Sequence, residues 1–145
     1  MKKILYIIPA IILAALVYSF WSAAPPVDYS GVSAGEIIWK VEVAKSQKER
    51  SKGLSGRNSL APLSGLLFVF PREDFHGIWM KEMRFPIDII WFNENLEVVG
   101  LKKDAVPEDF PEVFKPEAPA SFVLEINAGE AEKAQIKIKD ILKIF

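Results

Sequence analysis

The segment PIDIIWF-NEN-LEVVGLK, residues Pro86–Lys102, predicts a β-hairpin and decides the fold class. Two runs of strand length flank Asn93–Asn95, a connection that suits a turn with a left-handed position. Both faces of the first run are largely apolar, which is typical of a central strand. Asp88 is the polar exception in that run. We therefore expect a buried Asp88 with a basic partner, Arg57 first and Arg50 second.

Outside the hairpin, strand patterns outnumber helix patterns. Residues Glu36–Ala44 alternate with a period of two, as in a half-buried strand. Further strands are expected at Gly65–Phe70, Gly77–Lys81, Ser121–Ile126 and, as one strand or a tight pair, Gln135–Phe145. Capping patterns at Ser46–Glu49 and Asn127–Glu130 predict two short helices. The expected fold is mainly β, a compact antiparallel β-sandwich or partly open barrel with two short helices.

Residues 1–21 predict an N-terminal transmembrane helix that precedes this domain. Residues Ile4–Trp21 carry no charge and would span roughly 27 Å as a helix, near the thickness of a bilayer core. Lys2 and Lys3 place the N-terminus inside and the domain outside, so a single-pass protein of the cell membrane is expected. The alternative is a signal peptide cleaved after the small residues Ser22–Ala24, which would leave a secreted or periplasmic protein.

The remaining chain divides into a linker and one domain. Residues 22–35 are rich in Pro, Gly and small side chains, which is typical of a flexible linker, and residues 36–145 form the expected globular β-rich domain. The formal net charge of −1, without a basic cluster, argues against a nucleic-acid partner. The chain has no Cys and one His, so disulfides, thiol catalysis and Cys-based zinc sites are excluded, and we expect neither a cofactor nor a metal.

The arginines suggest where a ligand could bind, because all four lie between positions 50 and 84. Arginine suits bidentate recognition of anions, and Trp79 lies two positions from Lys81 on the same face of a strand. The irregular segment Asp104–Ala120 has the length of a lid. We expect a cleft that binds a small anionic or carbohydrate ligand. The candidate ligand-binding residues are Arg50, Arg57, Trp79, Lys81 and Asp88.

Three blocks in one stretch carry a family resemblance: RSKGLSGR at 50–57, GLLFVF at 65–70 and WMKEMRFPID at 79–88. Together with Val123–Glu125 and other late positions, they make residues 38–142 similar to the family called domain of unknown function 192, an uncharacterised extracytoplasmic or free-standing module of bacteria and archaea. The resemblance implies a compact antiparallel β-sandwich with small helical insertions, and no reaction. The chain departs from the family pattern at Glu82-Met83 and at Lys139.

Three functional hypotheses follow from these patterns. The first is an anchored extracytoplasmic binding or accessory module, for which a concave site is the expected sign. The second is a structural or protein-interaction domain without a small-molecule pocket, which would present a flat apolar patch. The third is a hydrolase acting on the envelope or on glycans, which would need two facing carboxylates. We assign no catalytic residue.

Overall fold

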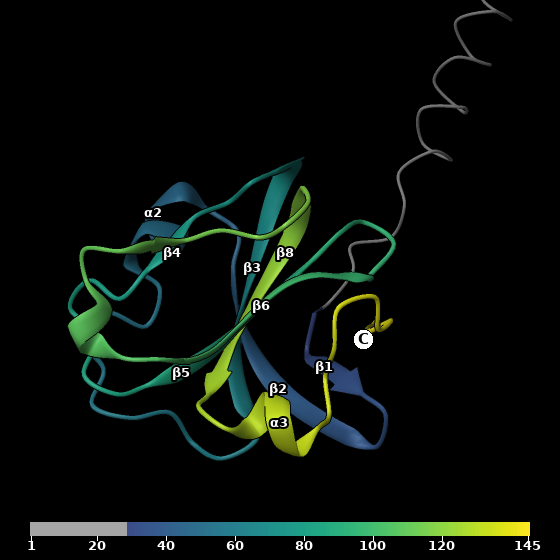
Figure 1. Ribbon diagram of the computed structural model, residues 1–145, viewed down its shortest axis with the longest axis horizontal. Coiled ribbons are helices and arrows are strands. Elements are labelled where there is room, and N and C mark those ends of the chain that lie inside the picture. Colours follow the sequence, from purple (N-terminus) through teal and green to yellow (C-terminus); the bar gives the residue numbers. More distant parts are fainter. Residues whose placement is uncertain (1–28) are drawn as a thin grey trace, which may run out of the picture.

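The computed structural model describes residues 29–145 (Figure 1), so the expected anchor at 1–21 lies outside the described residues. One sheet contains β1 (Gly31–Ala34), β2 (Ile37–Ala44), β3 (Ser64–Asp74), β5 (Ile87–Phe92), β6 (Val98–Ala105), β8 (Ala120–Asn127) and β9 (Lys143–Ile144). A second sheet pairs β4 (Ile78–Trp79) with β7 (Val113–Phe114). The helices are α2 (Gln47–Lys52), the 3-10 turn η2 (Pro107–Asp109) and α3 (Glu130–Lys133).

The large sheet has the order β6-β5-β8-β3-β2-β1-β9 and curls into a half-barrel (Figure 1). This confirms a mainly β fold with two short helices, and its shape is the partly open barrel rather than a sandwich of two sheets. One pair departs from the antiparallel expectation, because β2 and β3 run parallel from Lys40↔Ser64 to Ala44↔Phe68. Parallel neighbours need a long crossover, and the segment 45–63, which contains α2, provides it.

Each face of the sheet carries its own hydrophobic core, because strand side chains alternate between the two faces. The first core includes Leu66, Phe68 and Ile89 and lies on the side of β4 and the loop after α2. The second core includes Leu67 and Ile90 and lies on the side of α3. Within residues 29–145, every helix is too short and too polar to span a bilayer.

The capping prediction for α2 is confirmed atom by atom. The Ser46 hydroxyl accepts a hydrogen bond from the Glu49 backbone N–H, and the Glu49 carboxylate accepts one from the Ser46 N–H at 2.8 Å. Gly53 ends the helix with φ of 50°. A Cβ at Gly53 would stand 3.3 Å from the Phe68 ring, so the glycine also permits close packing of α2 on β3.

The hairpin prediction is confirmed for β5 and β6, but its turn differs in detail. The Asn93 carboxamide oxygen accepts hydrogen bonds from the N–H groups of Asn95 and Glu97, at 2.9 and 3.0 Å. The left-handed residue is Leu96, with φ of 63°, and not an asparagine. The Asn93 side chain thus stabilises the turn from its first position, and the left-handed residue lies one position after Asn95, where it was expected.

Four segments correct the expectations from sequence. Residues 31–34, expected in the linker, form β1 and belong to the sheet. Asn127 ends β8 and binds backbone carbonyls of the loop before β3, so Gly129 takes the N-cap position of α3. Segment 135–145 contributes only the short β9 and one bridge, Glu97↔Ile141. The segment 104–120, which was expected to be irregular, contains η2 and β7, and β7 pairs with β4.

Candidate functional site

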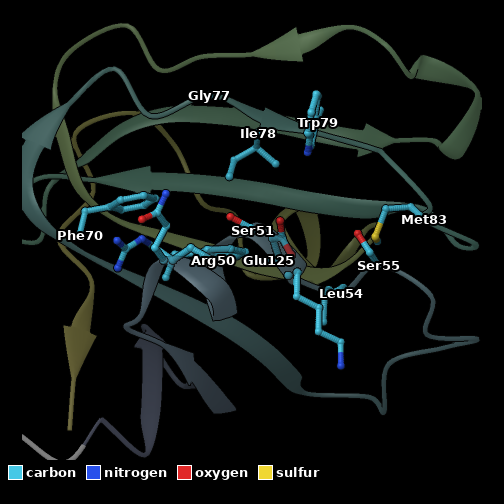
Figure 2. A pocket seen from close by; sticks show the side chains of 14 residues that line it. Arg50, Ser51, Leu54, Ser55, Phe70, Gly77, Ile78, Trp79, Met83 and Glu125 are labelled. Carbon is cyan, nitrogen blue, oxygen red and sulfur yellow. The ribbon is translucent and has the colours of Figure 1, made fainter.

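A cavity of about 350 Å³ lies between α2 and β4, on the face of the first core (Figure 2). Its apolar lining includes Leu54, Phe68, Phe70, Ile78 and Met83. Its polar and charged lining includes Gln47, Arg50, Ser51, Lys52, Ser55 and Glu125. Figure 2 shows Gly77, Ile78 and Trp79 on one side of the cavity, Arg50 and Leu54 on the other, and Glu125 between them. An apolar wall with a few polar groups is the usual composition of a small-molecule site.

Trp79 lies at the rim of this cavity with half of its surface exposed, 50%. The Lys81 ammonium lies 5.5 Å from the centroid of its ring, within the range of a cation–π contact. The structure therefore brings Trp79 and Lys81 together, but the expected strand Gly77–Lys81 is only Ile78–Trp79, and Lys81 lies in the turn after it. Lys81 stands beside the rim, however, and is not part of the cavity wall.

The segment 104–120 contacts the same rim, which is where a lid was expected. Phe110 meets the Trp79 ring edge to face, with centroids 5.9 Å apart. Val113 pairs with Trp79 across the β4–β7 sheet. A Cβ at Gly77 would stand 2.6 Å from the Val113 side chain, so this pairing needs a glycine at position 77. The segment is thus tied to β4 by strand pairing and by an aromatic contact.

Arg50 is the second expected residue that lines the cavity. Its Nη1 donates to the backbone carbonyls of Lys45 and Val69, the latter at 3.1 Å. Its guanidinium carbon lies 5.2 Å from the centroid of the Phe70 ring. These contacts anchor α2 to β3, so Arg50 shapes the wall of the cavity, and both hydrogen bonds use Nη1, one of the three guanidinium nitrogens.

Arg57 corrects the predicted ion pair. Its guanidinium binds Glu42 through two parallel contacts, Nη1 to Oε1 at 2.5 Å and Nη2 to Oε2 at 2.7 Å. The hydrogen bonds to Arg57 lower the pKa of Glu42 below its ordinary value, and those to Glu42 raise the pKa of Arg57. The predicted partnership with Asp88 is wrong, and Arg57 does not line the cavity.

Asp88 is fully buried, as predicted, but its partners are backbone groups. Oδ1 accepts from the Asp104 N–H and Oδ2 from the Ala131 N–H, both at 2.9 Å. Ala131 lies in the first turn of α3, so Asp88 supplies the side-chain cap that Gly129 lacks. Two charge-assisted hydrogen bonds satisfy the carboxylate without a cation. Alternation along β5 puts Asp88 on the α3 face, away from the cavity.

Glu125 is the cavity residue that the sequence analysis did not single out. It lies in the middle of β8, opposite Leu66 of β3 and Ile89 of β5, and is only 5% exposed. Its Oε2 has no hydrogen-bond partner. Burial raises the pKa of Glu125 to about 8, against a smaller opposing effect of the Arg57 charge. The available signal was a lone acid in the apolar run Phe122–Ile126, the same signal that marked Asp88.

Within residues 29–145, no three His, Asp or Glu side chains gather as metal ligands do. The described wall of the cavity contains a single carboxyl group, Glu125. The arrangement offers an aromatic stacking surface at the rim and hydroxyl, amide, carboxyl and cationic groups in the wall. Such a site can hold a ligand that combines an apolar face with several hydrogen-bonding groups.

Two solved structures share the fold. A protein of unknown function from Novosphingobium aromaticivorans matches with a TM-score of 0.74 and 30% identity, over 84% of this chain and 94% of that chain. A candidate transcription regulator from Sinorhizobium meliloti matches with a TM-score of 0.73 and 27% identity, over 81% of this chain and 96% of that chain.

Sequence comparison leads to the same group of proteins. A UPF0127 protein of Pyrococcus furiosus is 33% identical over 113 residues, which are 74% of this chain and 89% of that protein. The model of DUF192, described as "Uncharacterized ACR", matches residues 31–144. The match begins with β1 and ends with β9, so it spans the whole described domain. The chain belongs to the DUF192 family.

Proposed function

We propose that this protein is an extracytoplasmic binding module, tethered to the membrane by residues 1–21, whose cavity holds a small neutral ligand rich in hydroxyl groups, such as a sugar. The observation that carries the proposal is the half-exposed Trp79 ring at the rim of a cavity with a mixed apolar and polar wall. A sugar ring stacks its apolar face on an aromatic side chain and directs its hydroxyls to polar groups.

Of the three cations expected at the site, only Arg50 lines the cavity, and Lys52 of α2 lines it as well. Arg57 is bound to Glu42 outside the cavity, and Arg50 donates to two backbone carbonyls. Lys81 stands over the Trp79 ring and is not part of the cavity wall. The half-exposed Trp79 ring, on which a sugar can stack, is the reason that we propose the carbohydrate half of the sequence expectation.

A thermal-shift screen of the full chain, purified in a detergent without a sugar headgroup, tests the ligand class. The probes are glucose, galactose, mannose and N-acetylglucosamine, with sulfate, phosphate and glucuronate as the anionic set. We expect at least one neutral sugar to raise the melting temperature, because a ligand that binds only the folded state stabilises it. Stabilisation by anions alone, or by no probe, would contradict the proposal.

A matched pair of variants assigns any binding to the rim. Trp79→Ala should abolish the sugar-dependent shift, Trp79→Phe should retain part of it because a ring remains, and Phe75→Ala should leave it unchanged. Phe75 is exposed to a similar degree and does not line the cavity. An unchanged shift in a folded Trp79→Ala protein would place the ligand elsewhere.

The tether is tested separately by adding protease to intact cells. The uncharged run Ile4–Trp21 and the flanking Lys2 and Lys3 support an N-terminus inside. Residues 36–145 should be digested while an N-terminal tag remains protected. Recovery of a mature protein that begins at Pro25 would show a cleaved signal peptide instead.

A further inference from the structure

We propose that Glu125 selects the ligand of this cavity: its neutral carboxyl group pairs with a ligand hydroxyl, and ionisation of Glu125 releases the ligand. The inference rests on the proposed sugar-binding function and adds a specificity-determining residue and a dependence on pH. It starts from the one buried side-chain atom without a hydrogen-bond partner among residues 29–145, Oε2 of Glu125.

The position of Glu125 argues for a ligand contact. The side chain projects from the middle of β8 into the cavity between α2 and β4 (Figure 2). Its cross-strand neighbours on the same face, Leu66 and Ile89, are apolar and offer no hydrogen bond. A buried polar atom without a partner costs free energy, about 1–3 kcal/mol. Because Oε2 itself has almost no accessible surface, a ligand would reach the carboxyl group where the side chain lines the cavity, and a rotation of the carboxyl would let it supply the missing partner and recover that free energy.

The charged groups around Glu125 leave it neutral at pH 7. From α2 come Arg50, which is engaged with backbone carbonyls, and Lys52. The following loop contributes Arg57 and β2 contributes Glu42, which are bound to each other. Strand β4 lines the cavity without a charged group. None of these cations is hydrogen-bonded to Glu125, so burial dominates and raises the pKa of Glu125 to about 8.

A neutral carboxyl and a hydroxyl are matched partners, because each offers one donor and at least one acceptor. The ionised carboxylate keeps only acceptors and adds a charge that the apolar wall stabilises poorly. Filling the cavity with a sugar excludes more water and favours the neutral form further. A neutral sugar should therefore bind the protonated protein, and its affinity should fall as the pH rises above 8.

Calorimetric titration of the full chain with the four neutral monosaccharides, at pH 6 and at pH 9.5, tests this inference. Wild-type affinity should fall about tenfold or more between the two values, because only the protonated fraction binds. Glu125→Gln should bind with similar affinity at both, since an amide keeps a donor and an acceptor without titrating. Glu36→Gln, an exposed control, should behave as wild type.

Each other outcome overturns something specific. Three outcomes overturn the role of Glu125 and leave sugar binding standing. The affinity falls equally in wild type and Glu125→Gln, the affinity of wild type does not fall, or a folded Glu125→Gln protein no longer binds. No binding of any monosaccharide at pH 6 overturns the proposed function and this inference with it. If Glu125→Gln does not fold, wild type is titrated at pH 8.5 in buffers of different ionisation enthalpy. The inference requires that binding takes up a proton, so the measured binding enthalpy must change with the buffer, and an enthalpy that does not change overturns it.

Discussion

Two acidic residues lie in adjacent strands of one sheet, both almost completely buried, and they differ in the face to which they point. Asp88 of β5 points to the α3 side, where two backbone N–H groups bind its two oxygens. Glu125 of β8 points to the opposite side, where the side chain lines a cavity and Oε2 has no donor. The comparison shows that a buried carboxyl group serves the fold where the chain supplies its partners, and is available to a ligand where the chain does not.

The largest expected effect is the response of Glu125 to pH. Below about pH 4.5 the folded and unfolded states both hold the proton. Between 4.5 and about 8 only the unfolded state releases it, so wild-type stability falls across that window, by a few kcal/mol at most. Glu125→Gln removes this loss and should be more stable than wild type at pH 9, with the difference shrinking towards pH 4.5.

Urea denaturation of wild type, Glu125→Gln and the exposed control Glu36→Gln at pH 5, 7 and 9 measures this effect. The comparison with wild type at each pH cancels the titration of other groups. If the difference in the free energy of unfolding between Glu125→Gln and wild type stays constant from pH 5 to 9, the pKa of Glu125 is not raised by folding.

The second effect is a loss of stability on removing the Asp88 carboxylate. Asp88→Ala leaves the buried Ala131 N–H and the partly buried Asp104 N–H without acceptors, which should cost roughly 2–4 kcal/mol. Asp140→Ala is the matched control, because its carboxylate accepts a single exposed backbone N–H. Urea denaturation midpoints at pH 7 measure the loss of stability in each variant. A similar small loss in the two variants would show that the α3 cap is not important.

The smallest effect concerns Arg57, whose expected partnership with Asp88 the structure replaces. The Arg57–Glu42 pair is solvent-exposed on both sides, so Arg57→Ala should cost about 1 kcal/mol or less. In a double-mutant cycle, the losses from Arg57→Ala and Asp88→Ala should add, because the two residues share no contact. A coupling free energy of more than about 1 kcal/mol between the two substitutions would support the Arg57–Asp88 pair that the sequence predicted.

How far the sequence could predict this molecule depends on how local each interaction is. The capping box of α2 and the β5–β6 hairpin lie within short segments, and their patterns identified them correctly. The burial of Asp88 was also predicted, since it follows from the apolar neighbours in its own strand. Its partners were not, because Asp104 and Ala131 reach it only through the folded topology.

The candidate site shows the same limit. Trp79 and Lys81 lie close together as expected, but β4 ends at Trp79 and Lys81 lies in the turn that follows, so the expected strand geometry is not the cause. Arg57 and Arg50 were chosen for their chemistry, but their partners are set by packing that a single sequence does not display. Glu125, like Asp88, is a lone acidic residue in an apolar strand. It was not predicted as a site residue, because nothing in the sequence indicates which strand face will border a cavity.

The most direct test of the account is the ionisation of Glu125 itself. The full chain, labelled with ¹³C at the glutamate side-chain carboxyl, is titrated by NMR, and the resonance absent from Glu125→Gln is assigned to Glu125. The account predicts a midpoint near 8 in the absence of ligand, moving to higher pH when a neutral sugar binds. A midpoint near the ordinary value of about 4.5 would contradict it, because Glu125 would then be ionised in the empty cavity at neutral pH.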